Sequence, residues 1–405
     1  MNMKSRSLLS LTSASRRVAV STLPIGLCVM LAMPAPAIAQ HWARSWAAAP
    51  QVPLDDRPIP DLSNSTIEQV VRLSRGGTQI RLRISNEMSK SPLRIDRVDV
   101  AQLDIAGLAI PGSRRTVRFS AQEQLWLPAY APMISDPVPI PVGRLSRLLI
   151  RIHLQDGSAE PTVHVNAAAT TRIVRDSKPA EPIAIEQRLF LTGVDVSSAT
   201  PLRTIVAFGD SITDTSNTKD ADTRWPDALA KRLTGKKRQQ VSIANEGIAG
   251  TRVLTNRFNA LERFDRDVLS IPGVSHVILL EGINDIRGAW RENRSDQFSA
   301  ETLIVGYKQI IARAHDKGIR VILGTILPYK GERYWNEWGE NVRQNVNTWI
   351  RTTRETDGFI DFDKTLRDPA DLTRLAPRYD SGDKLHPSDA GLAAMAAAID
   401  LRLLQ

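Results

Sequence analysis

The chain has 405 residues, of which 42% are hydrophobic and 24% are charged. These are the proportions of a folded globular protein, and they exclude a disordered, collagen-like or coiled-coil chain. At roughly 100–200 residues per domain, this length favours two domains over one. The 53 basic residues outnumber the 44 acidic ones, and the formal net charge of +9 raises the question of a nucleic-acid or membrane-surface partner.

Residues 1–39 have the pattern of a secretory signal peptide. The segment opens with basic residues, continues through an apolar stretch from Val18 to Met33, and ends in Ala37-Ile38-Ala39. We therefore expect export to the periplasm or the medium after cleavage near Ala39, by the general secretory or the twin-arginine route. Prolines interrupt the apolar stretch, so no stable membrane anchor is expected.

The single cysteine, Cys28, lies inside this segment. The exported protein is therefore expected to contain no disulfide, no thiol nucleophile and no thiolate metal site. Four of the 53 basic residues and none of the 44 acidic residues lie in residues 1–39, which leaves 49 against 44 and a net charge near +5. This smaller excess suits a soluble exported protein, and no nucleic-acid partner is expected.

Residues 40–200 consist of short runs in which apolar and polar residues alternate. Ile80, Leu82 and Ile84 form one such run, and residues 149–154 form another. Turn-forming glycines and prolines separate the runs, and no helical period is sustained. The segment Pro132–Pro141 is typical of an edge strand or a loop. This pattern predicts an all-β, sandwich-like accessory domain over residues 40–200.

From residue 201 to residue 405 the pattern changes to apolar runs that alternate with amphipathic stretches. The expected strands are Thr204–Phe208, Val241–Ala244, His276–Leu280, Arg320–Ile326 and Phe359–Phe362. The expected helices include Trp225–Leu233, Ala300–Lys317 and Trp335–Arg354. The alternation predicts a mostly parallel sheet covered by helices on both faces. A length of about 205 residues suits a flavodoxin-like, three-layer α/β/α catalytic domain.

Glycines and small polar residues follow the first three of these strands. They lie in the segments Gly209–Ser211, Asn245–Thr251 and Glu281–Asp285. Because ligands bind at the carboxyl ends of the strands in such sheets, we expect these loops to meet. Near the C-terminus, the segment Asp383–Ser388 places a carboxylate three residues before His386.

These residue types suit nucleophilic catalysis. A serine hydroxyl such as that of Ser211 becomes an effective nucleophile only when a base removes its proton. His386 is the candidate base, and Asp383 is the candidate carboxylate that orients its ring. Taken alone, Ser211 has an alternative interpretation as a helix cap.

In order and type, the four segments resemble the sequence blocks of the SGNH or GDSL hydrolase family. The first block is matched by Gly209–Ser211, followed by Ile212 where the family's short name has leucine. The second ends at Gly250, the third is Gly282–Asp285 and the fourth is Asp383–Pro387. The resemblance covers the C-terminal half of the chain. More loosely, the first half resembles the accessory domain of exported two-domain members.

The resemblance implies an ester hydrolase that works through an acyl-serine intermediate. It assigns nucleophile, base and orienting acid to Ser211, His386 and Asp383. It assigns the oxyanion hole to the backbone N–H groups of Ser211 and Gly250 and to the side-chain amide of Asn284. No metal and no cofactor are expected, since the sequence has neither a metal-binding cluster such as H-E-x-x-H nor a nucleotide-binding glycine pattern.

Two other catalytic assignments are disfavoured. An α/β-hydrolase elbow, G-x-S-x-G, needs a glycine at position 213, where this chain has Thr213. The remaining histidines lie in expected strands, helices or the terminus without a partner motif, and we expect them to be structural. They are His41, His153, His164, His276 and His315.

The substrate is the least determined feature. An arginine and four aromatic residues near the third and fourth blocks are candidate substrate contacts, with solvation or helix packing as the alternative; they are Arg287, Trp290, Tyr334, Trp335 and Trp338. We favour short-acyl esters, on a small molecule or an O-acetylated polysaccharide. Three alternatives stay open: a lipase or lysophospholipase-type esterase, a sugar O-acyltransferase with the same triad, and a catalytically silent glycan-binding protein.

Overall fold

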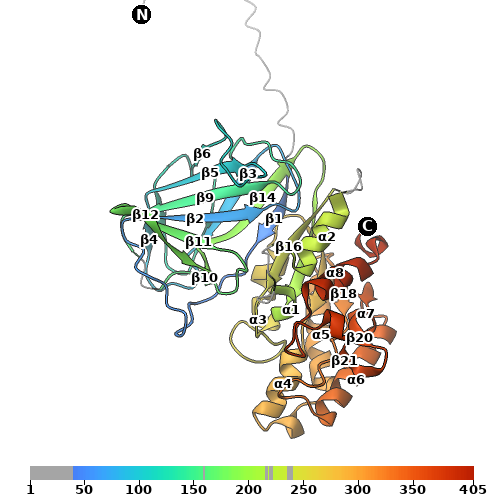
Figure 1. Cartoon of the computed structure of the whole chain (residues 1–405). Helices are drawn as coiled ribbons and strands as arrows, with labels where there is room; N and C mark the ends of the chain where they lie inside the picture. The colour runs from blue at the N-terminus through green and yellow to red at the C-terminus, as the bar shows by residue number, and fades with distance from the viewer. Residues whose placement is uncertain (1–39, 158–159, 215–217, 219–221, 235–239) are drawn as a thin grey trace, which may run out of the picture. The chain divides into compact units, whose positions relative to one another are not determined.

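The computed structural model of the chain describes residues 40–157, 160–214, 218, 222–234 and 240–405 (Figure 1). The expected signal peptide lies outside the described residues. In the part that is described, no helix is both long and apolar enough to cross a membrane. These residues belong to one compact unit with two main hydrophobic cores. One core is built from residues 43–202 and the other from residues 205–404, while the exact domain boundaries stay a prediction.

Antiparallel sheets build the first core. The smaller main sheet has the order β1 (His41–Ala47), β14 (Leu191–Ser198), β3 (Ile80–Ser85) and β8 (Pro132–Ile134). The larger one has the order β12 (Lys178–Ile185), β11 (Thr171–Arg175), β2 (Ser65–Arg72), β9 (Arg147–Leu154), β5 (Arg97–Leu103) and β6 (Arg115–Val117). Two short pairs join β4 (Leu93–Ile95) to β7 (Leu125–Leu127), and β10 (Val163–His164) to β13 (Arg188–Leu189).

The predicted alternation explains why these strands pack as a sandwich. In β9, Leu148, Ile150 and Ile152 are fully buried, while the residues between them are partly exposed. Each strand thus offers one apolar face to the shared core, as expected for antiparallel sheets. The prediction of a sandwich-like β region is confirmed. The expected edge strand is β8, which begins at Pro132 because proline cannot donate to a sheet ladder.

The second core surrounds a sheet of five parallel strands (Figure 1). Its order is β16 (Val241–Gly247), β15 (Arg203–Gly209), β17 (Val274–Leu280), β18 (Arg320–Gly324) and β19 (Gly358–Ile360). This order is that of a flavodoxin-like sheet, so the predicted fold class is confirmed. A hairpin of β20 (Arg367–Asp368) and β21 (Asp371–Leu375) follows the sheet.

The helices that cover this sheet form two groups: α8 contacts α2 and α7, while α5 contacts α3 and α6, and α6 also contacts α4. The helices are α1 (Ser211–Asp214), α2 (Trp225–Thr234), α3 (Ala260–Phe264), α4 (Ile283–Arg291), α5 (Ala300–His315), α6 (Glu337–Thr352), α7 (Phe362–Leu366) and α8 (Asp389–Ala398). The predicted helix Trp335–Arg354 begins two residues later than expected. The Asn336 side chain accepts a hydrogen bond from Gly339 N–H and so caps the helix at that point.

The β region is joined to the parallel sheet by buried polar contacts. The Arg44 N–H of β1 donates to Thr204 Oγ1 at 3.0 Å, and Ser74 Oγ donates to the Ile243 carbonyl at 2.8 Å. The buried Arg44 guanidinium, paired with Asp195 inside the β region at 2.5 Å, also lies 3.9 Å from the Glu246 carboxylate of β16. These contacts fix the β region against the β15–β16 edge of the sheet, beside the loops that carry the predicted catalytic residues.

Candidate active site

Ser211 follows the carboxyl end of β15, which is an inner strand of the parallel sheet. The strand ends at Gly209, where a Cβ would lie 2.2 Å from the Leu280 carbonyl oxygen, so only glycine fits beside β17. Asp210 then accepts a hydrogen bond from Ile212 N–H at 2.9 Å. This side chain stabilises the sharp turn that makes Ser211 the first residue of α1.

The structure brings Ser211, His386 and Asp383 into one hydrogen-bonded chain. Ser211 Oγ lies 2.8 Å from His386 Nε2, and His386 Nδ1 lies 2.6 Å from Asp383 Oδ2. With a proton on Nδ1 donated to the carboxylate, Nε2 is free to accept the proton of the serine hydroxyl. The two elements that meet here are 175 residues apart in sequence.

The loop before α8 holds Asp383 in its ionised form. Its second oxygen, Oδ1, accepts the backbone N–H groups of Leu385 and His386 at 2.9 and 2.8 Å. Partial burial by itself raises the pKa of Asp383, but these bonds and the bond from the His386 ring outweigh it and hold the pKa below its ordinary value. The neighbouring Asp380 bonds instead to the backbone of Gly382 and Lys384. Asp383 is therefore the carboxylate that faces the imidazole.

Asn284 lies in the first turn of α4 with its amide orientation fixed on both sides. Its oxygen accepts a hydrogen bond from Arg287 at 2.9 Å, and its Nδ2 donates to the Thr251 carbonyl at 3.1 Å. Arg287 in turn pairs with Glu332 at 2.7 Å. An amide nitrogen has two hydrogens, so one remains for a further acceptor.

Gly250 lies on the loop after β16 with φ +78°, a conformation that favours glycine. No protein atom of the described residues lies within 4 Å of a Cβ built there, so steric crowding does not exclude a side chain. The backbone conformation is what requires glycine in this structure. Among the described residues, the N–H groups of Ser211 and Gly250 donate to no protein acceptor.

Two residues that the sequence did not single out hold these loops together. Asp214, the last residue of α1, accepts the Ala249 N–H at 2.9 Å through Oδ2. Its Oδ1 lies 2.9 Å from Nε2 of His164, which comes from the β region. Asp214 therefore connects the Ser211 turn to the loop of Gly250, and His164 braces Asp214 from the accessory side.

The predicted substrate contacts fall into two groups. Arg287 lies 5.8 Å from the Tyr334 ring and binds Asn284, so both residues lie beside the candidate oxyanion site. The rings of Trp338 and Trp290 stack with their centroids 6.2 Å apart. Trp338 and Trp335 both pack against the core. No described contact joins this aromatic group to Ser211, and the packing interpretation fits the geometry. Substrate contact stays a prediction for all five residues.

Several carboxyl groups are buried beneath the site. Burial raises the pKa of Asp210 to about 6 and that of Asp285 to about 7. Burial and the nearby Asp267 raise the pKa of Glu246 to about 8. Asp285 accepts the backbone N–H groups of Val253 and Leu254 at 2.8 and 3.1 Å, so it braces the loop after β16.

The raised pKa of Glu246 makes a prediction about stability. In the unfolded chain this carboxyl ionises near pH 4.5, whereas in the folded protein it keeps its proton to about pH 8. The contribution of the protonated Glu246 to the free energy of unfolding is therefore fully present below pH 4.5, and it is lost as the pH rises toward 8. Glu246→Gln removes this loss. The unfolding free energy of this variant should match that of the native protein near pH 4 and exceed it by more than ~1 kcal/mol at pH 8.5.

Denaturant unfolding at both pH values measures this difference. The exposed Glu123, which pairs with Arg118 at 2.8 Å, supplies the control Glu123→Gln, expected to show no pH-dependent gain. A Glu246→Gln variant that is equally destabilised at both pH values would contradict the assignment of a protonated, buried Glu246.

Comparison with known proteins places the α/β half of the chain. Residues 207–394 match the model of the GDSL-like Lipase/Acylhydrolase family. Among solved structures, an acetylxylan esterase from Geobacillus stearothermophilus is similar at 21% identity over 50% of this chain and 94% of its own, with a TM-score of 0.39. A GDSL-like lipase from Bacteroides thetaiotaomicron is similar at 19% identity over 50% of this chain and 88% of its own, with a TM-score of 0.38. No curated protein matched the chain.

The family match covers most of the parallel α/β half of the chain, and the resemblance drawn from the four sequence blocks is confirmed for that half.

Proposed function

We propose that the protein is a carboxylic ester hydrolase that works through an acyl-serine intermediate at Ser211. The observation that carries the proposal is the hydrogen-bonded chain from Ser211 through His386 to Asp383 at the carboxyl edge of a parallel sheet. This arrangement supplies a nucleophile, a base in reach of its proton, and a carboxylate that fixes the tautomer of the base.

The reaction proceeds in two halves. Ser211 Oγ attacks the ester carbonyl carbon while its proton passes to His386 Nε2, and His386 then returns the proton to the departing alcohol. A water molecule attacks the acyl-serine in the same way, releasing the acid and restoring Ser211. Asp383 stabilises the imidazolium that forms in both halves.

The negative oxygen of each tetrahedral intermediate needs hydrogen-bond donors. The N–H groups of Ser211 and Gly250 and the remaining hydrogen of the Asn284 amide are the candidates. Two observations support this. The N–H groups of Ser211 and Gly250 have no described protein acceptor, and the hydrogen bond from Arg287 to the Asn284 oxygen fixes the orientation of the Asn284 amide. A donor fixed before the reaction loses little energy in reorganising.

The role of Asn284 makes a direct prediction. Asn284→Ala should lower kcat by about 10²–10³-fold and change KM much less, because the donor acts mainly in the transition state. Steady-state kinetics on a small ester measures both values. The matched control is Arg291→Met on the same helix, where Arg291 pairs only with Glu292 at 3.0 Å and the side chain is exposed. A fall in kcat of less than about fivefold would remove Asn284 from the oxyanion site.

The favoured substrates are short-acyl esters, such as O-acetyl groups on a carbohydrate. The side chains in the hydrogen-bonded chain that starts at Asn284 are polar, namely Arg287 and Glu332, and the ring beside Arg287 is that of Tyr334, which carries a hydroxyl group. A long acyl chain requires a continuous apolar groove to bury it. Polar surroundings therefore favour a small acyl group and a hydrophilic alcohol.

A series of 4-nitrophenyl esters from acetate to palmitate tests this preference. We expect kcat/KM to be highest for acetate and to fall with chain length. A maximum at decanoate or longer would instead identify a lipase-type enzyme. Transfer of the acyl group to a sugar without release of free acid would identify an acyltransferase, and no turnover of any ester would leave only a binding protein.

The site of action is proposed to be outside the cytoplasm, after removal of residues 1–39. The pattern of that segment supports export, as does the confinement of the single cysteine to it. Sequencing the N-terminus of the protein recovered from the periplasm or the medium tests this, with Gln40 or a nearby residue expected first. Recovery of the intact chain from the cytoplasm alone would contradict it.

A further inference from the structure

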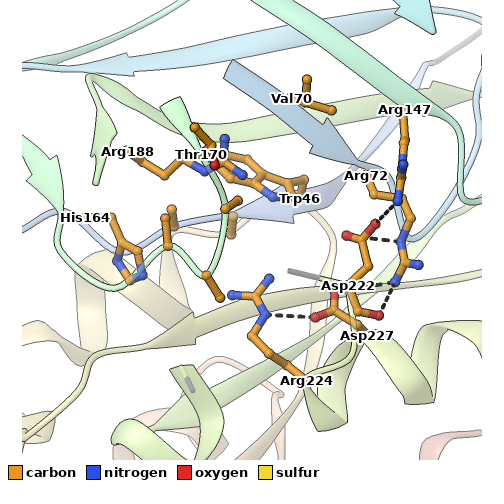
Figure 2. Close-up of a pocket in the computed structure, with 15 residues that line it drawn as sticks. Trp46, Val70, Arg72, Arg147, His164, Thr170, Arg188, Asp222, Arg224 and Asp227 are labelled. Atoms are coloured by element: carbon orange, nitrogen blue, oxygen red, sulfur yellow. Dashed lines mark hydrogen bonds and ion pairs between the residues drawn. The ribbon is translucent and has the colours of Figure 1, made fainter. Parts of the chain in front are cut away.

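A cavity without triad residues in its lining lies where the β region meets the residues around the start of α2 (Figure 2). Its volume is about 520 Å³, within the range of about 300–1,000 Å³ that small-molecule sites occupy. The walls come from β1, β2 and β13 and from the residues around the start of α2. The triad residues are not part of its lining.

Four arginines line this cavity, and three of them have acidic partners. Arg147 pairs with Asp222 at 2.8 Å and Arg224 pairs with Asp227 at 2.8 Å, as the dashed lines in Figure 2 mark. The third, Arg72, lies 3.5 Å from Asp222. The fourth arginine is different, because no carboxylate of the described residues pairs with it.

This fourth arginine is Arg188, which is only 5% exposed. Its guanidinium lies 5.6 Å from the ring of Trp46, and its Nη1 is buried without a hydrogen-bond partner among the described residues. Burial, followed by the nearby Arg224, lowers the pKa of Arg188 to about 10, so it still carries its charge at neutral pH. A buried, charged donor without an acceptor is unfavourable unless a ligand supplies one.

The other residues of the lining indicate which chemical groups the rest of that ligand carries. Alanines at positions 47, 48 and 167–169 keep part of the wall small and allow close approach. The ion-paired carboxylates of Asp222 and Asp227 and the arginines beside them can accept from and donate to hydroxyl groups. A planar guanidinium matches the two oxygens of a carboxylate.

We propose that this cavity binds a hydroxylated carboxylate, of the sugar-acid type, with its carboxylate paired to Arg188. His164 also lines the cavity, directly opposite Arg188 in the β10–β13 pair, and its ring reaches Asp214 behind the Ser211 turn. The ligand is therefore bound one side chain away from the catalytic loops. The lining contains no triad residue, so binding at this site does not require the Ser211 hydroxyl.

Calorimetric titration of the purified protein with D-galacturonate tests the proposal. We expect saturable binding that Arg188→Met weakens by about 10- to 100-fold, the effect of losing a charge-assisted hydrogen bond. The matched control is Arg172→Met on β11, an exposed arginine outside the cavity, which should bind as the native protein does. Ser211→Ala should also bind normally, which separates this site from the proposed hydrolysis.

A second variant guards against a folding defect in Arg188→Met. Val70 lines the cavity on β2 and is 38% exposed, so Val70→Glu adds a repelling charge at a surface position and should weaken binding at least tenfold. In the Ser211→Ala variant, which cannot hydrolyse it, the methyl ester of galacturonate should bind much more weakly than the acid. The proposal is overturned if galacturonate does not bind at millimolar concentration, if the methyl ester binds equally well, if inorganic phosphate displaces the sugar acid with equal affinity, or if both variants bind like the native protein.

Discussion

Replacement of Ser211 by alanine should lower ester hydrolysis by about 10⁴-fold or more while leaving the fold intact. Among the described residues, Ser211 Oγ is the hydrogen-bond partner of His386 Nε2, at 2.8 Å, so the variant loses both the nucleophile and the proton that the base accepts. Ser211 makes no other described side-chain hydrogen bond, and the turn depends on Asp210 instead. Thermal unfolding should therefore change little.

The measurement is kcat/KM for 4-nitrophenyl acetate, together with a melting curve for each variant. Ser270→Ala is the matched control, because Ser270 is exposed and, among the described residues, its Oγ donates only to the Arg266 carbonyl. Activity of Ser211→Ala within tenfold of the native protein would show that another residue attacks the ester.

Asp383→Asn should lower kcat by about 10²–10⁴-fold with a smaller change in KM. Two backbone N–H groups donate to Oδ1 of Asp383, so the amide oxygen of the variant is retained there. Its NH₂ group then faces His386 Nδ1 and forces the ring proton onto Nε2. That tautomer cannot accept the proton of Ser211.

The same loop offers a control with the same change of charge. Asp380→Asn keeps the acceptor for the N–H groups of Gly382 and Lys384 and loses only the ion pair with the Lys384 ammonium at 2.8 Å. We expect its kcat to stay within about tenfold of the native value. If the two variants lose activity equally, the carboxylate acts through the loop conformation rather than through the imidazole.

The fold could be predicted from the sequence because its signals are local. Alternating residues such as Ile80, Leu82 and Ile84 expose one apolar face per strand, and the later apolar runs are too continuous for a half-exposed sheet. The strands and helices that were expected differ from the structure at their ends, and the short β20–β21 hairpin was not expected. The predicted strand to Ile326 stops at Gly324, since the Ile326 N–H donates to the side chain of Asn347 rather than to a neighbouring strand.

The residues of the triad could be predicted because each is part of a short motif at the end of a strand or the start of a helix. The residues that contact the catalytic loops or line the cavity from the β region could not be predicted. His164 carries no motif, and its bond to Asp214 exists only because β10 lies beside the Ser211 turn in three dimensions. Arg188 reads as an ordinary surface arginine, and only tertiary packing against Trp46 buries it. Partners that depend on how distant segments pack leave no local pattern.

The most direct test of the central claim is labelling with a serine-directed phosphonate followed by mass spectrometry of the digested protein. The account predicts one phosphonate per chain, on the peptide that contains Ser211, with loss of esterase activity in proportion to labelling. His386→Ala should label far more slowly, because no base then activates the hydroxyl. A protein that hydrolyses esters while Ser211 stays unmodified, or that is inactivated by labelling at another residue, would contradict it.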